Sequence, residues 1–327
     1  MKNKYHILSL LLVLAAPLLA ADKSPTWTDP EKATKEDPDF SIQGEYGKNA
    51  PGADLGVQVV ALGKGKFDAY LLEGGLPGVG WTKEKKRTRI SGETDGAVVK
   101  FPESNGYSAE IRDGKITLTS GGKKTTLPRI HRQSPTLNAK PPAGAVVLFD
   151  GSSADEWKNG KVVDGLLAAT NAMSKKAFSD CIIHIEFRTP YKPQARGQKR
   201  GNSGVYHGGR WETQILDSFG LDGKMNECGG IYSVAAPRLN MCLPPLTWQT
   251  YDVELIAAKF DEKGNRTAWP RITVKLNGVL VHENLELAKN ATAAAPLKGP
   301  IPATGNPIFL QNHANPVFFR NIWVKEK

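Results

Sequence analysis

Residues 200–218, RGNSGVYHGGRWETQILDS, carry the pattern that decides the fold. After a turn rich in small residues, the side chains alternate between two faces, which is the period of a β-strand. One face carries Glu212 and Gln214, and the other carries Trp211 and Ile215. A strand face with a carboxylate and an amide predicts either contact with a polar, sugar-like ligand or a solvated face of an antiparallel sandwich. The pattern alone leaves both open.

The rest of the chain favours short strands over helices. Its 327 residues include 33 Gly and 22 Pro, which punctuate strands, and no long stretch has the helical period. Residues 180–188, DCIIHIEFR, alternate cleanly between apolar and polar side chains. Strand signals of this kind across residues 145–327 predict an all-β, two-sheet jelly-roll sandwich.

A second β-region precedes this sandwich. Two short alternating runs within it are joined by Asp113-Gly114, a strong hairpin signal, so we expect a small antiparallel β-domain. The predicted organisation is a signal peptide at 1–21, a flexible lead-in at 22–39, the small β-domain at 40–132, a Pro-rich linker at 133–144 and the sandwich at 145–327.

The first residues have the layout of a secretory signal peptide. Lys2 and Lys4 precede an apolar stretch at 7–19, which is too short to span a bilayer comfortably, and Ala20 and Ala21 offer small residues for cleavage. No second apolar run reaches membrane length. We therefore expect an exported protein, periplasmic or secreted, without a membrane span.

The distribution of basic residues along the chain bears on whether the protein binds nucleic acid. The formal net charge is +10, but neither basic run, at 83–89 or at 196–200, is interleaved with aromatic residues as a nucleic-acid platform would be. We therefore expect no nucleic-acid partner.

The chain has three cysteines, and an odd number leaves at least one thiol free. Cys181 lies on the apolar phase of its strand and is expected in the core. Cys228 and Cys242 could form a disulfide. No pair has the CxxC spacing that structural zinc sites use, so we expect no such site.

Polar residues outside the opening stretch are further candidates for a site. His184, Glu186 and Arg188 share one phase of their strand and could line the same concavity as Glu212 and Gln214, although an ordinary amphipathic strand gives the same pattern. His313 stands where a strand gives way to a loop, next to Asn312, and loops on rigid scaffolds often carry chemistry. Trp248 could stack on a sugar face or anchor the core.

Eight segments along the chain resemble, in order, those of the 3-keto-disaccharide hydrolase family. The resemblance covers residues 145–327 and implies a concanavalin-like jelly-roll, distantly similar to laminarinases and lichenases, that acts on glycosides oxidised at C3 of the sugar. Residues 40–132 resemble an N-terminal extension found beside this domain, for which the resemblance implies no activity. The segments are VLFDGSSADEW (147–157), HIEFRTP (184–190), RGNSGVY (200–206), ETQILDS (212–218), CGGIY (228–232), WQTYDVE (248–254), NGVLV (277–281) and IFLQNHANPVFFRNIWVK (308–325).

The chain departs from the family pattern at two positions. Trp211 replaces the usual Tyr and keeps an aromatic side chain. In LQNHA, Asn312 replaces the usual Asp, which removes a charge beside His313 and puts in doubt a metal-ligand or His-orienting role at position 312.

The activity that the resemblance implies has clear chemical needs. A carbonyl at C3 acidifies the C2 hydrogen, so a base can remove it, the C1 oxygen leaves by β-elimination, and water addition completes a net hydrolysis. This route needs a base, an acid for the leaving group and a group that stabilises the enolate. Arg188 or a divalent metal ion of unassigned ligands could stabilise the enolate, and no organic cofactor is expected. The candidate catalytic residues are Glu186, Glu212 and His313, and the candidate substrate contacts are Arg188, Asn202, Gln214, Asp217, Tyr232, Trp248 and Asn312.

Two other functions stay open. Laminarinase-like glycosidases use an E-x-D-x-x-E strand, and the corresponding pattern here is Glu212-x-Gln214-x-x-Asp217, without the central carboxylate and with a shorter last one. A retaining pair stands about 5–5.5 Å apart, which the shorter acid makes harder to reach. A non-catalytic glycan-binding module is the other alternative, because the same architecture serves lectins.

Overall fold

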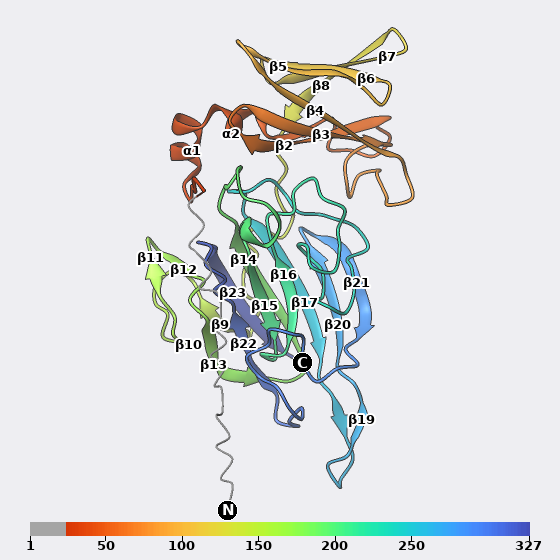
Figure 1. Ribbon diagram of the computed structural model, residues 1–327. Helices are drawn as coiled ribbons and strands as arrows, with labels where there is room; N and C mark the ends of the chain where they lie inside the picture. The colour runs from red at the N-terminus through yellow and green to blue at the C-terminus, as the bar shows by residue number, and fades with distance from the viewer. Residues whose placement is uncertain (1–23) are drawn as a thin grey trace, which may run out of the picture.

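A computed structural model describes residues 24–327 and is built almost entirely from antiparallel β-strands, as the sequence predicts. The strands form an eight-stranded closed barrel followed by a two-sheet sandwich, with the barrel seated on one end of the sandwich (Figure 1). The predicted signal peptide at 1–21 lies outside the described residues. Within residues 24–327, none of the helices is long or apolar enough to cross a membrane.

The barrel is a meander that closes when its last strand pairs with its first. Asp113 and Gly114 both have positive φ, of 50° and 68°, and form the predicted hairpin turn between β6 and β7. Apolar side chains such as Phe67 and Ile116 fill the interior. The strands are β1 (Gly44–Tyr46), β2 (Leu55–Gly63), β3 (Lys66–Glu73), β4 (Arg87–Asp95), β5 (Val98–Ser104), β6 (Tyr107–Arg112), β7 (Lys115–Ser120) and β8 (Lys123–Ile130).

The described part of the expected flexible lead-in is instead ordered. It contains the helix α1 (Pro30–Glu36) and the start of α2 (Pro38–Ile42), which begin after the N-cap residues Asp29 and Asp37. The rings of Trp27 and Phe40 pack on Tyr191 of the sandwich, with centroids 5.4 and 5.0 Å away. Composition does not reveal these helices or this distant aromatic partner, which only the fold brings close.

The sandwich consists of two antiparallel sheets. The smaller has the strand order β10-β13-β22-β15-β16, the larger has the order β11-β12-β23-β14-β17-β20-β21 with β9 beside β23, and β18 pairs with β19. The elements are β9 (Val146–Phe149), β10 (Trp157–Lys158), β11 (Val162–Val163), β12 (Leu166–Ala168), β13 (Ala172–Phe178), β14 (Cys181–Arg188), the 3₁₀ turn η1 (Gly197–Lys199), β15 (Ser203–His207), β16 (Trp211–Ile215), β17 (Gln249–Ile256), β18 (Lys259–Phe260), β19 (Arg266–Ala268), β20 (Arg271–Leu276), β21 (Val279–Glu286), β22 (Asn306–Leu310) and β23 (Phe318–Glu326).

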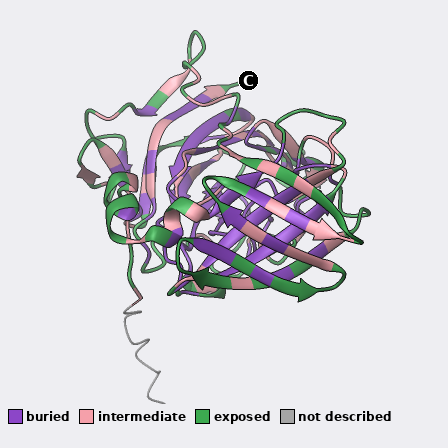
Figure 2. Ribbon diagram, turned by 90° about the horizontal axis from the view of Figure 1, so that it is seen from above, coloured by how far each residue is buried: buried purple, intermediate pink, exposed green. Residues whose placement is uncertain are grey.

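The main core lies between the two sheets, where the buried strands of Figure 2 run. From the smaller sheet it takes Val205, Ile215 and Leu310, and from the larger sheet it takes side chains such as Ile185 and Val253. Successive side chains of a strand point to opposite faces of the sheet. The side chains that alternate with these core residues therefore point away from the core. The sandwich therefore has two separate outer faces on which polar residues can gather.

The three cysteines are all free and buried. Cys181 lies in the core, as predicted. The Cys228 thiol lies 3.4 Å from the Tyr251 hydroxyl, and the Cys242 thiol lies 3.5 Å from the carbonyl oxygen of Leu216. The disulfide that the sequence allowed between Cys228 and Cys242 is absent from the described residues.

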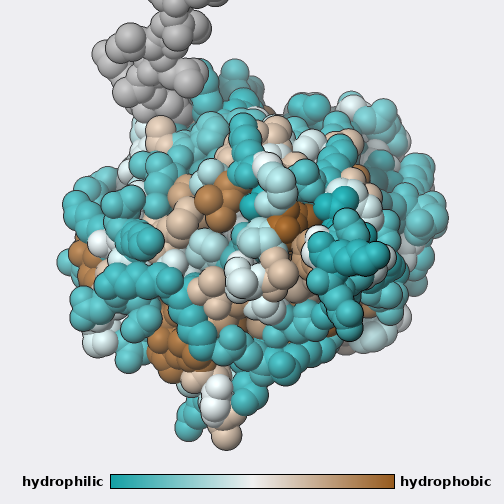
Figure 3. Space-filling model, turned by 90° about the horizontal axis from the view of Figure 1, so that it is seen from below, coloured by the Kyte–Doolittle hydropathy of each residue, from teal (hydrophilic) through white to brown (hydrophobic). Residues whose placement is uncertain are grey.

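The surface seen from the end of the molecule opposite the barrel is mainly hydrophilic. Its hydrophobic side chains form small, separated patches (Figure 3). Figure 3 thus shows no large continuous hydrophobic patch among the described residues of this face.

Candidate functional site

The polar face predicted for β16 is the outer face of the smaller sheet. Trp211 and Ile215 point into the core, whereas Glu212 and Gln214 alternate with them and point away. Across the sheet, Gly204 of β15 pairs with Gln214, and Tyr206 pairs with Glu212. Gln311, just after β22, completes the row because its backbone N–H donates to the Gly204 carbonyl at 3.0 Å.

Glu212 is the centre of a short hydrogen-bond chain on this face. The Tyr206 hydroxyl donates to Glu212 Oε2 at 2.7 Å, and Gln311 Nε2 donates to the same hydroxyl at 3.0 Å. Glu212, Tyr206 and Gln311 are all buried. Two strands and the residue that follows β22 thus hold one carboxyl group in a fixed position.

Burial shifts the proton affinities of this chain. It raises the pKa of Glu212 from 4.5 to about 7, although the hydrogen bond from Tyr206 lowers it. Burial, and then the neighbouring Glu212 carboxylate, raise the pKa of the Tyr206 hydroxyl. At neutral pH Glu212 can therefore gain or lose a proton, while Tyr206 keeps its own.

Gly204 provides the space that Glu212 occupies. A Cβ atom at position 204 would stand 2.3 Å from Glu212 Oε1 and 2.9 Å from its Cδ. Gly204 does not need the left-handed backbone conformation, since it is part of a regular strand. The absence of a side chain here serves the position of the carboxyl group.

A loop and a neighbouring segment enclose the Glu212 end of the row. The backbone N–H of Glu212 donates to the Thr292 hydroxyl, and Ala295 packs against Tyr206. Tyr232 donates its backbone N–H to the Glu212 carbonyl at 3.0 Å. These contacts explain why the carboxyl group is desolvated.

Asn202 and Gln214 form the other end of the polar row. Asn202 Nδ2 and Gln214 Nε2 both donate to Gln198 Oε1, at 2.9 and 3.1 Å. Gln198 belongs to η1 and donates in turn to the carbonyl of Asn226 at 3.0 Å. The structure therefore brings Glu212, Asn202, Gln214 and Tyr232 together around one face of the smaller sheet.

Glu186, Arg188 and Trp248 lie on the opposite side of the molecule. Ile185 and Phe187 of β14 point into the core, so Glu186 and Arg188 point to the outer face of the larger sheet. The expectation that they share a concavity with Glu212 was wrong, since two sheets, about 10 Å apart, separate the faces. Alternation fixed the phase of each strand, but it could not show which sheet the strand joins.

Glu186 belongs to a buried cluster of charged and polar groups beneath the predicted linker. Its carboxylate accepts hydrogen bonds from Arg320 Nε at 2.7 Å, from Asn321 Nδ2 at 2.9 Å and from the backbone N–H of Asn138 at 2.5 Å. Burial alone would raise its pKa, but these bonds and the His184 imidazole lower it to about 2. Residues 133–144 are thus fastened to the sheet, and Glu186 is occupied by structural partners.

Trp248 forms a stack with two arginines on the same face. The guanidinium carbons of Arg188 and Arg320 stand 4.9 and 4.2 Å from its ring centroid. These distances fit cation–π contacts. The predicted substrate contacts of Arg188 and Trp248 are therefore remote from Glu212.

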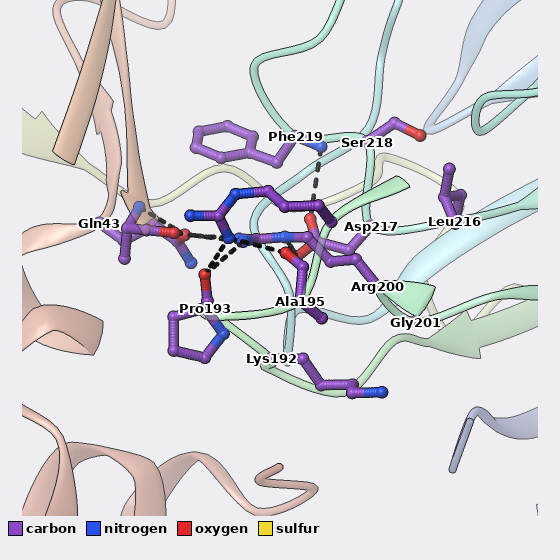
Figure 4. Close-up of polar contacts among 12 residues, drawn as sticks. Gln43, Lys192, Pro193, Ala195, Arg200, Gly201, Leu216, Asp217, Ser218 and Phe219 are labelled. Atoms are coloured by element: carbon purple, nitrogen blue, oxygen red, sulfur yellow. Dashed lines mark hydrogen bonds and ion pairs between the residues drawn. The ribbon is translucent and has the colours of Figure 1, made fainter. Parts of the chain in front are cut away.

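Asp217 also takes a structural position. It is fully buried, and its Oδ2 accepts a hydrogen bond from Arg200 Nε at 2.7 Å (Figure 4). Arg200 then donates to the Ala61 carbonyl of the barrel and to Gln43 Oε1. Asp217 therefore helps to join the sandwich to the barrel and is occupied by Arg200, and its predicted contact with substrate stays a prediction.

His313 and Asn312 are exposed in the loop that follows β22. Asn312 Oδ1 accepts the backbone N–H of Ala314 at 2.9 Å and so shapes the turn. His313 stands two residues after Gln311, a member of the polar row. The roles predicted for both residues remain predictions.

The side chains around Glu212 offer few ligands for a metal ion. Across residues 24–327, no three His, Cys, Asp or Glu side chains gather closely enough to hold one. Within the residues that the structure describes, the polar row around Glu212 also contains three buried amide oxygens without a hydrogen-bond partner, those of Asn202, Gln214 and Gln311. The divalent ion stays a prediction.

A cavity of about 350 Å³ lies elsewhere, at the junction of α2, the barrel and residues 244–247. Arg132 and Glu45 on its wall pair with each other, and Arg129 donates to the Gln43 carbonyl. Its charged groups are thus already paired, and the polar row around Glu212 remains the better candidate site.

Three members of the site were missed in the sequence. Tyr206 shares the strand phase of Gly204, and this alternation could have revealed it. Gln311 lies within the LQNHA motif, next to Asn312, where the chain departs from the family pattern. Gln198 lies in an irregular turn, and no local pattern connects it to Asn202 and Gln214.

Comparison with known proteins places the sandwich in a family. The model of the 3-keto-alpha-glucoside-1,2-lyase-like domain matches residues 144–325, and no curated protein matches the chain. A crystal structure from Parabacteroides distasonis ATCC 8503, of a protein named "putative glycosyl hydrolase", has 30% sequence identity and a TM-score of 0.50, covering 57% of this chain and 84% of that one. A second structure with the same name and organism has 19% identity and a TM-score of 0.41, covering 56% and 94%.

The family match confirms the resemblance found in the sequence, and it spans more than half of the chain. The protein is therefore carbohydrate-active and belongs to the 3-keto-alpha-glucoside-1,2-lyase-like family.

Proposed function

We propose that this protein cleaves 3-keto-glycosides by removing the C2 proton and expelling the C1 oxygen substituent. The products of this step are the alcohol and a sugar with a C1–C2 double bond conjugated to the C3 carbonyl. Addition of water across that double bond gives the 3-keto-sugar, so the net reaction is hydrolysis. We further propose that the protein acts after export, as its N-terminal sequence suggests.

The observation that carries this proposal is that Glu212 is a buried carboxyl group held by Tyr206, with a raised pKa. A general base works best when its pKa lies near the working pH, and burial raises the pKa of Glu212 to about 7. The C3 carbonyl lowers the pKa of the C2 hydrogen enough for a carboxylate to remove it. An ordinary glycoside lacks that activation and needs a second carboxylate, whereas Asp217 is engaged by Arg200.

Tyr206 has a supporting role in this chemistry. Its hydroxyl keeps its proton and donates to Glu212 Oε2, so it orients the carboxylate and favours its charged form. The departing C1 oxygen needs a proton. Glu212 is the first candidate donor, because it has just taken a proton from C2. His313 is the second candidate donor, and a divalent cation at the enolate oxygen remains part of the proposal.

The first test is turnover of chromogenic 3-keto-α- and 3-keto-β-glucosides beside their unoxidised parents, with and without a chelator. We expect release from a keto substrate only, with a loss of at least a hundredfold in Glu212→Gln. Glu262→Gln, at an exposed turn, is the matched control and should keep full turnover.

The other outcomes decide between the alternatives. Release from a parent glycoside would replace this proposal with a conventional glycosidase. Carbohydrate binding without release from any substrate would favour the glycan-binding module. Loss of release on chelation would add the metal ion to the site.

A further inference from the structure

We infer that the side-chain amides of Asn202 and Gln214 form a two-donor site for a carbonyl oxygen, and that Gln198 fills this site until a substrate ketone displaces it. The inference rests on the proposed function, because it assigns the C3 oxygen of a 3-keto-sugar to this end of the polar row.

Two convergent donors define the site. Asn202 Nδ2 and Gln214 Nε2 approach one oxygen, Gln198 Oε1, at 2.9 and 3.1 Å. The residues that supply them are only 2% and 1% exposed. Two fixed, desolvated N–H donors aimed at one oxygen form the arrangement that stabilises an oxyanion in enzymes. An amide oxygen in this place is therefore chemically equivalent to the oxygen of a bound ketone.

Gln198 is a replaceable occupant. It is half-buried in the short turn η1, between Gly197 and Lys199, which are both exposed. Its amide is held by the donors Asn202 and Gln214 and by the Asn226 carbonyl. Because the side chain is anchored by hydrogen bonds rather than by the core, a ligand that offers a similar oxygen can exchange with it.

Nearby acceptors point to the class of ligand. In the described part of the chain, Asn202 Oδ1, Gln214 Oε1 and Gln311 Oε1 are buried and have no hydrogen-bond partner. Buried acceptors without donors are costly, so a ligand with hydroxyl groups gains by binding them. Two donors for one oxygen, beside three acceptors, fit a sugar ring with one carbonyl flanked by hydroxyls.

The position relative to Glu212 is consistent with the chemistry. Gln214 and Glu212 are two residues apart on one face of β16, and side chains at this spacing stand roughly 7 Å apart. C2 and C3 are bonded neighbours in the sugar. A ring whose C3 oxygen lies at Gln214 can therefore present its C2 hydrogen toward Glu212.

The test is binding of 3-keto-1,5-anhydroglucitol, which has no leaving group at C1, against its 3-hydroxy parent, by calorimetry on the full chain. We expect the wild type to prefer the ketone. Asn202→Leu and Gln214→Met should each reduce this preference about tenfold, since each loses a hydrogen bond to a polarised oxygen. Gln198→Met should tighten ketone binding several-fold, because the internal competitor is gone.

Controls keep the result decisive. Gln194→Met, at an exposed position in the preceding loop, should bind like the wild type. If a donor variant does not fold, Gln214→Glu, which keeps the shape but repels an oxyanion, replaces it. Equal affinity for ketone and parent in the wild type, an unchanged preference in the donor variants, or weaker ketone binding in Gln198→Met would overturn the inference.

The ligand has no glycosidic bond to cleave, so the outcome is independent of glycoside turnover. Ketone preference that depends on Gln214, in a protein that cleaves no 3-keto-glycoside, would keep this site and remove the proposed function. Cleavage that survives in the donor variants with unchanged KM and kcat would do the reverse.

Discussion

The Tyr206 hydroxyl donates a 2.7 Å hydrogen bond to Oε2 of Glu212, and the two residues are register partners on β15 and β16. Strand pairing therefore sets the position of the donor relative to the carboxylate. Burial raises the pKa of Glu212 to about 7, and this one bond opposes that rise. The pair gives the outer face of the smaller sheet a group that can exchange a proton at neutral pH.

Replacing Tyr206 with Phe should move the acid limb of the kcat/KM–pH profile upward by about one to two pH units. The hydrogen bond lowers the pKa of Glu212, so its loss raises that pKa, and the base is ionised only at higher pH. A hydrogen bond to a charged group contributes about 1.5–3 kcal/mol, which is equivalent to at least one pH unit. The profile on a 3-keto-glucoside measures this shift. Tyr107→Phe in the barrel is the control, and an acid limb that stays in place would contradict the assignment of Glu212 as base.

Glu212→Gln should stabilise the protein at alkaline pH. The folded state raises the pKa of Glu212 from 4.5 to about 7, so the stability associated with this group is complete below pH 4.5 and is lost as the pH rises through 7. Glutamine avoids that loss, which amounts to about 3 kcal/mol by pH 9. Urea unfolding at pH 5 and pH 9 measures the difference. An equal effect of the substitution at both pH values would show that the carboxyl group is not desolvated.

Gly204→Ala should destabilise the protein because of Glu212. The new Cβ would stand 2.3 Å from Glu212 Oε1, and overpacking of this kind costs about 1–3 kcal/mol. In a Glu212→Ala background the obstacle is gone, so the same substitution should cost much less. A double-mutant cycle of unfolding free energies measures the coupling. Equal costs in both backgrounds would mean that Gly204 is needed for another reason.

Glu186→Gln should reduce stability while turnover remains. Glu186 is held by Arg320, Asn321 and His184 and lies on the other outer face, away from Glu212. Its pKa is lowered from 4.5 to about 2, so its stabilising effect is present above pH 4.5 and disappears as the pH falls through 2. The loss should be about 3 kcal/mol at pH 7 and small near pH 2. Denaturation at several pH values, with kcat at pH 7, tests this, and a large fall in kcat without unfolding would restore Glu186 as a catalytic candidate.

Asp217→Asn should weaken the junction between barrel and sandwich. Asp217 is buried against Arg200, which donates to the Ala61 carbonyl of the barrel, so the substitution leaves a buried charge unpaired at a cost of about 3–5 kcal/mol. Asp222→Asn is the matched control. Asp222 pairs with Arg87 across the same junction but is exposed, so its loss should cost about 1 kcal/mol or less. Similar effects of the two substitutions on thermal unfolding would contradict this difference.

Features of the site that depend on neighbouring residues could be predicted from the sequence, and features that depend on contacts between distant segments could not. Alternation is a local property of the backbone, so the sequence separated Glu212 and Gln214 from Trp211 and Ile215. The same rule placed Ile185 in the core. Glu186 shows what alternation cannot predict. Its strand has the same pattern, yet it belongs to the other sheet, and Glu186 lies beneath a linker that no local signal connects to it. Asp217 likewise has a partner that no local pattern indicates, because Arg200 is 17 residues away.

The sequence by itself determined the all-β class, the core phase of the strands that contain Ile185 and Ile215, the Asp113-Gly114 turn and the family of residues 144–325. These follow from the two-residue period of a strand, from the positive φ of a tight turn and from motifs in a fixed order. Only the tertiary structure decided which polar phases share a face, and therefore that Glu212 joins Tyr206, Gln311 and Gln214 while Glu186 does not. It also decided the pKa of Glu212, because desolvation depends on segments that are distant in sequence, such as the loop around Thr292.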